Sequence, residues 1–218
     1  MYKKYIKRIL DFVFAVILLI LLSPVMILSA IAIKLEDPKG PVLFKQKRPG
    51  KHAKIFTVYK FRTMRVETEK DGRPLSNMER ITKVGAFLRK TSIDELPQLF
   101  NIIRGEMSFI GPRPLLVQYL DYYTPEQMRR HEVTPGISGW AQVNGRNTIT
   151  WEEKFKYDLW YVDNVSFVVD LRIFFKTIFK VLKGEGINQS DKVTMTQFHG
   201  SEDLHTEIVT SKIGSEDK

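Results

Sequence analysis

The chain has 218 residues and carries 34 Lys and Arg against 25 Asp and Glu, a net charge of +9, and it contains no cysteine. The lack of cysteine excludes a disulfide scaffold, a thiolate zinc site and a cysteine nucleophile. A hydrophobic fraction of 43% argues against global disorder. Residues 184–218 hold three lysines against seven acidic residues, which leaves residues 1–183 with 31 basic against 18 acidic side chains, or +13. Such a basic body indicates an anionic partner: nucleic acid, an acidic membrane or a phosphorylated small molecule.

The N-terminal part contains an uncharged run of 22 residues, 12–33, which is long enough to cross a bilayer and too long for the core of a signal peptide. Pro24 lies in its middle and predicts a kink or break, and the Ser23 hydroxyl could donate to the carbonyl that Pro24 frees. From these residues alone, a kinked span and a re-entrant helix-break-helix are equally favoured. The re-entrant form explains why basic residues lie on both flanks, since the positive-inside rule favours one: Lys3, Lys4, Lys7 and Arg8 before the run, and Lys34, Lys39, Lys45, Lys47 and Arg48 after it.

The rest of the chain predicts a mostly α fold with a small β-hairpin, an α+β class. Residues 42–62 predict the hairpin, around the turn at Pro49 and Gly50, and residues 66–80 predict a loop. Residues 81–90 predict a short helix, and a second helix is expected to begin near Ser92 and end at Gly105. Residues 115–123, 126–131 and 151–161 predict further helical pieces, whereas the Gly-rich and Asn-rich residues 134–147 predict largely irregular structure.

Residues 167–183 form the clearest amphipathic helix of the sequence. Basic residues line one face and Phe, Leu and Ile line the other, which is typical of a helix that lies in a membrane interface, although a core-facing helix with a solvated side has the same pattern. The segment after Asn188 is polar and acidic, and we expect it to be poorly ordered.

Two adjacent carboxylates, Asp94 and Glu95, are the sharpest candidates for chemistry. One interpretation is structural: with Ser92 they fit a capping box, and acids are favoured in a first helical turn. The other is a nucleophilic aspartate that attacks phosphorus, with a neighbouring acid. Such a reaction needs Mg²⁺ and arginines against charge repulsion. On this fragment alone the cap is the favoured interpretation.

Basic residues that could help lie in loops or at the ends of predicted elements: Lys60, Arg62, Arg65, Arg89 and Arg113. Arg113 stands between Pro112 and Pro114, which stiffen the backbone and suit bidentate phosphate binding, unless the segment is only a structural turn. Arg146 is a weaker candidate of the same kind. The four histidines show no metal-ligand spacing, and the sequence has no P-loop and no Gly-x-Gly-x-x-Gly run.

Ordered motifs over most of the chain resemble the bacterial sugar transferases, also called monotopic phosphoglycosyl transferases, in their small bacillosaminyl-phosphate transferase form. The similarity runs from residue 7 to about residue 183. Its motifs are KRILDF at 7–12, the Ser23-Pro24 pair, RPG at 48–50, YKFRTM at 59–64, SIDELPQLFN at 92–101, GEMSFIGPRP at 105–114 and PGISGWAQVNGR at 135–146. The acidic tail lies outside the pattern.

The resemblance implies roles for individual residues. It makes Asp94 the nucleophile and a Mg²⁺ ligand, with Glu95 completing the dyad as a proton acceptor or an orienting group. It implies a membrane helix, residues 1–36, that re-enters at Ser23 and Pro24. It implies a compact cytoplasmic catalytic domain, residues 37–187, that includes the interfacial helix 167–183, followed by the tail 188–218. The substrate-binding candidates are Lys60, Arg89, Pro112, Arg113, Arg146 and Asp158.

The implied reaction transfers a sugar-1-phosphate from a UDP-sugar to polyprenyl (undecaprenyl) phosphate at the cytoplasmic face of the bacterial inner membrane. UMP leaves, a phosphosugar-aspartyl intermediate forms, and the product initiates glycoconjugate biosynthesis, including protein glycosylation. UDP-diacetylbacillosamine is the first expected donor, with UDP-GlcNAc, UDP-GalNAc and UDP-galactose as alternatives. Anionic lipids and downstream glycosyltransferases are expected partners.

Two other classes of function compete with this one. A membrane-tethered nucleic-acid-binding protein would explain the charge, but the basic residues do not alternate with aromatic ones as in a stacking platform, so we expect no nucleic-acid partner. A non-catalytic membrane scaffold for glycan assembly is the more remote alternative.

Overall fold

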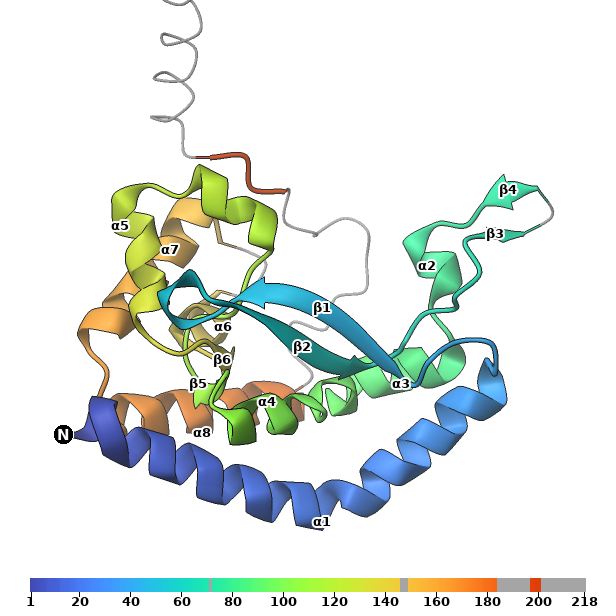
Figure 1. Cartoon of the computed structure of the whole chain (residues 1–218), viewed down its shortest axis with the longest axis horizontal. Coiled ribbons are helices and arrows are strands. Elements are labelled where there is room, and N and C mark those ends of the chain that lie inside the picture. Colours follow the sequence, from blue (N-terminus) through green and yellow to red (C-terminus); the bar gives the residue numbers. More distant parts are fainter. Residues whose placement is uncertain (71, 146–148, 184–196, 201–218) are drawn as a thin grey trace, which may run out of the picture.

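The computed structural model describes residues 1–70, 72–145, 149–183 and 197–200. Within these ranges the chain is mostly helical and contains three two-stranded sheets, each formed from short strands (Figure 1). This agrees with the α+β fold expected from the sequence. The long helix α1 and the helix α8 lie along one side of the molecule (Figure 1).

Helix α1 spans Lys7–Glu36 and follows a π-helical turn, η1, at Tyr2–Ile6. The Ser23 hydroxyl donates a 2.8 Å hydrogen bond to the carbonyl of Ile20, as the sequence suggested. The expected helix-break-helix is wrong in one respect, because α1 continues through Pro24 and bends instead of breaking (Figure 1). Among the described residues it is the one helix that is long and apolar enough to cross a membrane.

Both ends of α1 are tied to the rest of the domain. Near its start, the Arg8 guanidinium donates to the carbonyls of Ile102 and Ile103 at 2.5 and 2.7 Å. At its end, the Glu36 carboxylate accepts bonds of 2.8 Å from the backbone amides of Lys83 and Val84. The two ends of the apolar helix are therefore held by one body.

The expected hairpin is confirmed. Strand β1, Leu43–Pro49, pairs antiparallel with β2, Ile55–Phe61, across the 3₁₀ turn η2 at Lys51–Ala53. Phe56 and Val58 of β2 pack in a buried cluster with Ala15 of α1 and with Leu99 and Ile102 of α4. The hairpin therefore packs directly against the long apolar helix α1.

Residues 66–80 contain more structure than the expected loop. The short strands β3 at Glu69–Lys70 and β4 at Arg73–Pro74 form a hairpin, and helix α2 follows at Asn77–Arg80 with a capping box between Ser76 and Glu79. The next two helices match the expectation: α3 spans Lys83–Lys90 and α4 spans Gln98–Arg104. Gly105 ends α4 with a φ of +81°.

The expectation of largely irregular structure at residues 134–147 is wrong for residues 136–138 and 140–144. Strand β6, Gly136–Ser138, pairs in parallel with β5, Ser108–Ile110, and helix α6 spans Trp140–Asn144. The glycines of this stretch permit close backbone approach, since a Cβ on Gly136 would lie 2.1 Å from the amide nitrogen of Gly111. The residues that suggested a loop therefore allow a tightly packed strand.

The remaining expected helices are present. The 3₁₀ helix η4 spans Val117–Tyr122, α5 spans Pro125–Met128 and the 3₁₀ helix η5 spans Arg129–Glu132. Helix α7 spans Trp151–Asp163, and α8 spans Phe167–Lys183 with the bounds that the amphipathic pattern predicts.

Part of the tail differs from the expectation of a polar, poorly ordered segment. Phe198 is 2% exposed and packs among Tyr119, Tyr123, Trp151 and Phe155, so residues 197–200 are anchored on η4 and α7. Residues 184–196 and 201–218 lie outside the described part of the chain.

Candidate active site

The adjacent carboxylates lie in a 3₁₀ turn, η3 at Ile93–Glu95, ahead of α4. Ser92, which precedes the turn, has a φ of +57° and makes no side-chain cap hydrogen bond. The capping-box interpretation is therefore wrong. A non-glycine residue in this left-handed conformation is uncommon, and such strain concentrates at functional sites.

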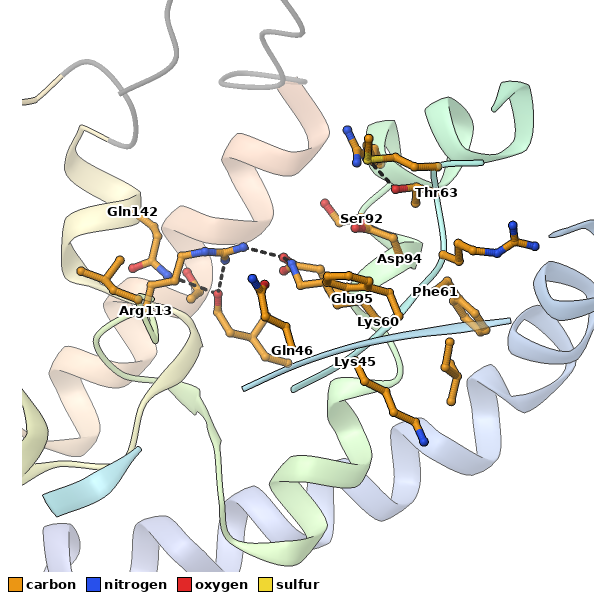
Figure 2. Close-up of a pocket in the computed structure, with 18 of the residues that line it drawn as sticks. Lys45, Gln46, Lys60, Phe61, Thr63, Ser92, Asp94, Glu95, Arg113 and Gln142 are labelled. Atoms are coloured by element: carbon orange, nitrogen blue, oxygen red, sulfur yellow. Dashed lines mark hydrogen bonds and ion pairs between the residues drawn. The ribbon is translucent and has the colours of Figure 1, made fainter. Parts of the chain in front are cut away.

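Glu95 carries the main ion-pair contacts of the site. Its Oε1 atom accepts bonds from Lys60 Nζ at 2.7 Å and from Arg113 Nη2 at 2.6 Å (Figure 2). Burial alone would raise the pKa of Glu95, but the charges and hydrogen bonds of Arg113 and Lys60 outweigh it and lower the pKa to about 2. Glu95 is thus a permanent anion that holds two cations in place.

Asp94 is in a different state, although it is the adjacent residue. Its side chain lines the cavity, and within the described ranges it makes no hydrogen bond or ion pair (Figure 2). Burial, and then the charge of Glu95, raise the pKa of Asp94, while Lys60, Arg89 and Arg113 oppose the shift. Because Lys60 and Arg113 bind Glu95 and not Asp94, the Asp94 oxygens stay open to a molecule in the cavity.

Arg89 reaches the site from α3. Its Nε donates a 2.8 Å bond to the Thr63 hydroxyl, just beyond the end of β2. Gly85 lets the helix approach this closely, since a Cβ there would lie 2.1 Å from the Thr63 carbonyl oxygen. The close packing of α3 against residue 63 places the Arg89 guanidinium at the cavity wall.

Arg113 is presented by a loop anchored on β6. The Pro112 carbonyl accepts a 3.0 Å bond from the Gly136 amide, and the Gly111 amide donates a 2.8 Å bond to the Ser138 carbonyl. Pro112 thus contributes through its backbone, and its side chain is not among the described residues that line the cavity. Arg113 itself extends into the cavity toward Glu95 (Figure 2).

Asp158 of α7 is placed at the cavity wall but points mainly at Arg130. The Arg130 Nε and Nη2 atoms donate to Asp158 Oδ2 at 3.1 and 2.7 Å, and both side chains are 2% exposed. Arg130 is a site residue that sequence reasoning missed, because its pairing joins residues 28 positions apart. Arg146 lies outside the described residues, so its role in substrate binding stays a prediction.

The site residues share one cavity of about 1230 Å³. Basic side chains outnumber acidic ones along its wall: Lys45, Lys60, Arg62, Arg65, Arg80, Arg89, Arg113, Arg130 and Lys154, against Asp94, Glu95 and Asp158. Lys154 was also missed by the sequence analysis; burial lowers its pKa to about 8. The cavity is large enough for a nucleotide-sized ligand and electrostatically suited to an anionic one.

Comparisons with known proteins agree with the sequence motifs. Residues 2–184 match the family model of the bacterial sugar transferases. The chain is 54% identical over 199 residues to "Uncharacterized sugar transferase EpsL" of Bacillus subtilis, covering 91% of this chain and 98% of that protein. It is also 45% identical to the UDP-N-acetylgalactosamine-undecaprenyl-phosphate N-acetylgalactosaminephosphotransferase of Aeromonas hydrophila, over 84% of this chain and 45% of the relative. A UDP-glucose:undecaprenyl-phosphate glucose-1-phosphate transferase of Escherichia coli is 44% identical, over 81% and 40%.

The chain belongs to the bacterial sugar transferase family, as its motifs indicate, and is a transferase. It spans nearly the whole of the Bacillus relative but less than half the length of the Aeromonas and Escherichia relatives. The matched region contains α1, the hairpin and every described residue of the candidate site.

Proposed function

We propose that the protein transfers a sugar-1-phosphate from a UDP-sugar to polyprenyl phosphate, with Asp94 as the nucleophile. One observation carries this proposal. Of two adjacent carboxylates at the cavity, Glu95 holds Lys60 and Arg113, while Asp94 has no partner among the described residues. A carboxylate that is open to the cavity and flanked by fixed cations is suited to attack an anionic phosphorus centre.

In the first step an Asp94 oxygen attacks the β-phosphorus of the UDP-sugar. A bond forms between that oxygen and phosphorus, the bond from phosphorus to the bridging oxygen breaks, and UMP leaves with the electron pair. Arg113, Lys60 and Arg89 hold the negative charge of the diphosphate. Glu95, with its pKa of about 2, is too weak a base to take a proton near neutral pH, so we assign it the orienting role.

The residues present fit a Mg²⁺ ion that is bound mainly through the substrate. Mg²⁺ commonly takes one or two carboxylates together with substrate phosphates, and Asp94 offers such a carboxylate. Within the described chain no group of three acidic, histidine or cysteine side chains could hold a metal alone. Bound there, Mg²⁺ would supply charge neutralisation for the diphosphate.

In the second step the phosphate oxygen of the lipid attacks the phosphorus of the phosphosugar-aspartyl adduct, and the Asp94 carboxylate leaves. The site therefore has to meet the membrane surface. Helix α8 supports such a placement, because large apolar residues on one of its faces are exposed, including Phe174, Phe175 and Phe179. Arg172 and Lys176 of α8 lie over the Trp140 ring at 5.6 and 4.7 Å and could meet anionic lipid phosphates.

We further propose that α1 enters the bacterial inner membrane from the cytoplasmic face and returns to it. Ile20, Leu21 and Leu28 in its middle are each at least 66% exposed, whereas Arg8 and Glu36 near its ends bind the domain. A helix that is apolar in the middle and tied to one body at both ends is suited to a monotopic arrangement. The basic flanks on both sides agree with it.

The proposed identity of the donor sugar is based on the family resemblance alone. UDP-diacetylbacillosamine stays our first proposal, and the assay panel should also hold UDP-GlcNAc, UDP-GalNAc, UDP-galactose and UDP-glucose. The last is included because relatives are named for glucose-1-phosphate transfer. Release of UMP from one member of this panel identifies the donor, and the lipid product would then serve downstream glycosyltransferases in glycoconjugate assembly.

The decisive experiment is Asp94→Asn in the full chain, assayed for UMP release and for a covalent phosphosugar adduct by intact mass. The nucleophile assignment predicts that both are lost. Glu95→Gln is the matched control at the adjacent residue. It should still form the adduct, at a reduced rate, since the nucleophile remains. Full turnover by Asp94→Asn would overturn the assignment, and dyad variants that work in the cell would favour the scaffold alternative.

A further inference from the structure

We infer that Arg130 is a positioning residue for Arg113, and that the buried Arg130–Asp158 pair acts on the reaction through the loop that presents this guanidinium. The inference rests on the proposed function, because it requires Arg113 to act on the substrate. Both side chains line the cavity wall, where the pair joins η5 to α7.

Three successive contacts connect Asp158 to Glu95 in space. Asp158 Oδ2 accepts from Arg130 Nη2 at 2.7 Å, and the same nitrogen lies 2.8 Å from the carbonyl oxygen of Arg113. The Arg113 guanidinium then donates to Glu95 at 2.6 Å. Arg130 is thus the link between a fixed carboxylate on α7 and the main chain of the residue that contacts the dyad.

The link matters because Arg113 has few other restraints. Its side chain is 44% exposed, and its other hydrogen bond within the described residues is a 3.4 Å bond to the Ile137 carbonyl. The flanking bonds of the loop are made by Gly111 and Pro112, on one side of it. The hydrogen bond from Arg130 holds the carbonyl group of Arg113. It thereby fixes the position of the Cα atom from which the Arg113 side chain extends.

The environment of Arg130 keeps it in one place. Its guanidinium lies 5.8 Å from the Tyr123 ring and 6.0 Å from the Phe155 ring, and the residue is 3% exposed. Arg130 is therefore fixed in the cavity wall, with its Nε and Nη2 donors directed at Asp158 and the Arg113 carbonyl. A buried ion pair is seldom needed for stability, since an apolar pair of similar volume often replaces it without loss. A role in positioning Arg113 is therefore a better explanation for the buried Arg130–Asp158 pair than a role in stability.

The test is a double-mutant cycle measured on kcat/KM for the UDP-sugar that the panel identifies. The apolar replacement Arg130→Met with Asp158→Leu removes the link and is designed to keep the fold. A misplacement of about 1 Å at a reacting centre costs on the order of 100-fold in rate, so we expect a loss of roughly 10-fold to 100-fold. In an Arg113→Gln background, the same replacement should cost less than about threefold, because its effect passes through the missing guanidinium.

The matched control is the neighbouring exposed pair, Arg129→Gln with Asp163→Asn, which joins the same two elements at the surface. It should leave kcat/KM unchanged in both backgrounds. If the apolar pair lowers the unfolding midpoint more than this control does, Arg130→Lys takes its place in the cycle. Lysine keeps the charge opposite Asp158 but lacks the planar set of donors that serves two acceptors.

Losses that multiply in the two backgrounds would overturn the inference, as would full activity in a folded link variant. Multiplying losses would indicate instead that Asp158 contacts the substrate directly. Failure of the proposed function is distinguishable, because the wild-type enzyme would then release no UMP and the cycle would have no starting rate.

Discussion

The Ser23 hydroxyl donates to the Ile20 carbonyl, which is the acceptor that Pro24, four residues further on, cannot serve. A carbonyl without a donor is costly in lipid, because no water is present to replace the lost bond. Ser23 therefore allows a bend in the middle of an apolar helix without leaving a polar group unpaired. The bend also lets both ends of α1 reach the same domain.

The first prediction concerns the side of the membrane on which the two ends of α1 lie. The protein has no cysteine, so a single introduced one can be labelled specifically. Lys4→Cys and Lys51→Cys place exposed probes before and after the helix. In sealed vesicles both should react from the same side. Labelling from opposite sides would contradict the re-entrant arrangement and favour a span.

Pro24→Ala tests the cause of the bend. It restores the missing backbone donor, so α1 should straighten and the two probes should no longer share one side in all molecules. Ser23→Ala is the matched control: it keeps the proline and the orientation, but it should lower the unfolding midpoint because the Ile20 carbonyl loses its donor. Identical labelling in the Pro24→Ala protein would show that the proline does not set the topology.

The bend was predictable from the sequence because donor, acceptor and proline lie within five residues. The bounds of α8 were predictable for a similar reason, since its apolar and basic residues repeat with the helical period over 17 positions. The hairpin of β1 and β2 followed from residues adjacent to its turn. Local patterns of this kind need no knowledge of the rest of the fold.

Much of the site could not be predicted, because it depends on contacts between distant residues. Asp94 and Glu95 have the same charge and adjacent positions, yet only the placement of Lys60 and Arg113 makes one a bound anion and the other open. The pairing of β5 with β6 depends on close approach of two glycine backbones 25 residues apart. Family motifs pointed to the dyad, whereas the residues alone favoured a cap.

The third prediction concerns the anchored tail. Phe198 contacts five aromatic rings, two of which, Tyr123 and Phe155, flank Arg130. Removing a buried Phe side chain typically costs about 3–5 kcal/mol. Phe198→Ala should therefore lower the free energy of unfolding by that order, as measured by denaturant titration in detergent. His199→Ala alters the adjacent exposed residue and should cost less than about 0.5 kcal/mol. Equal stability of the two variants would contradict the packing of this segment.

The fourth prediction concerns the pH dependence of stability and rests on His131. This residue is 6% exposed, and its Nδ1 lies 3.1 Å from the Gly50 carbonyl, so that nitrogen carries the proton of the neutral ring. Within the described structure its Nε2 has no hydrogen-bond partner. Burial first, and then the charge of Arg130, lower the pKa of His131 to about 4, from 6.5 in an exposed histidine.

A depressed histidine pKa means that the unfolded chain binds a proton more readily than the folded one between pH 6.5 and pH 4. The stabilising contribution of neutral His131 is therefore fully present above pH 6.5 and is lost as the pH falls through that window. Between pH 7 and pH 5 the loss should be about 2 kcal/mol. His131→Gln keeps a donor for the Gly50 carbonyl but cannot titrate, so its free energy of unfolding should fall less than that of the wild type over the same interval. Parallel pH profiles for the two proteins would contradict the assignment, because every other titrating group is common to both.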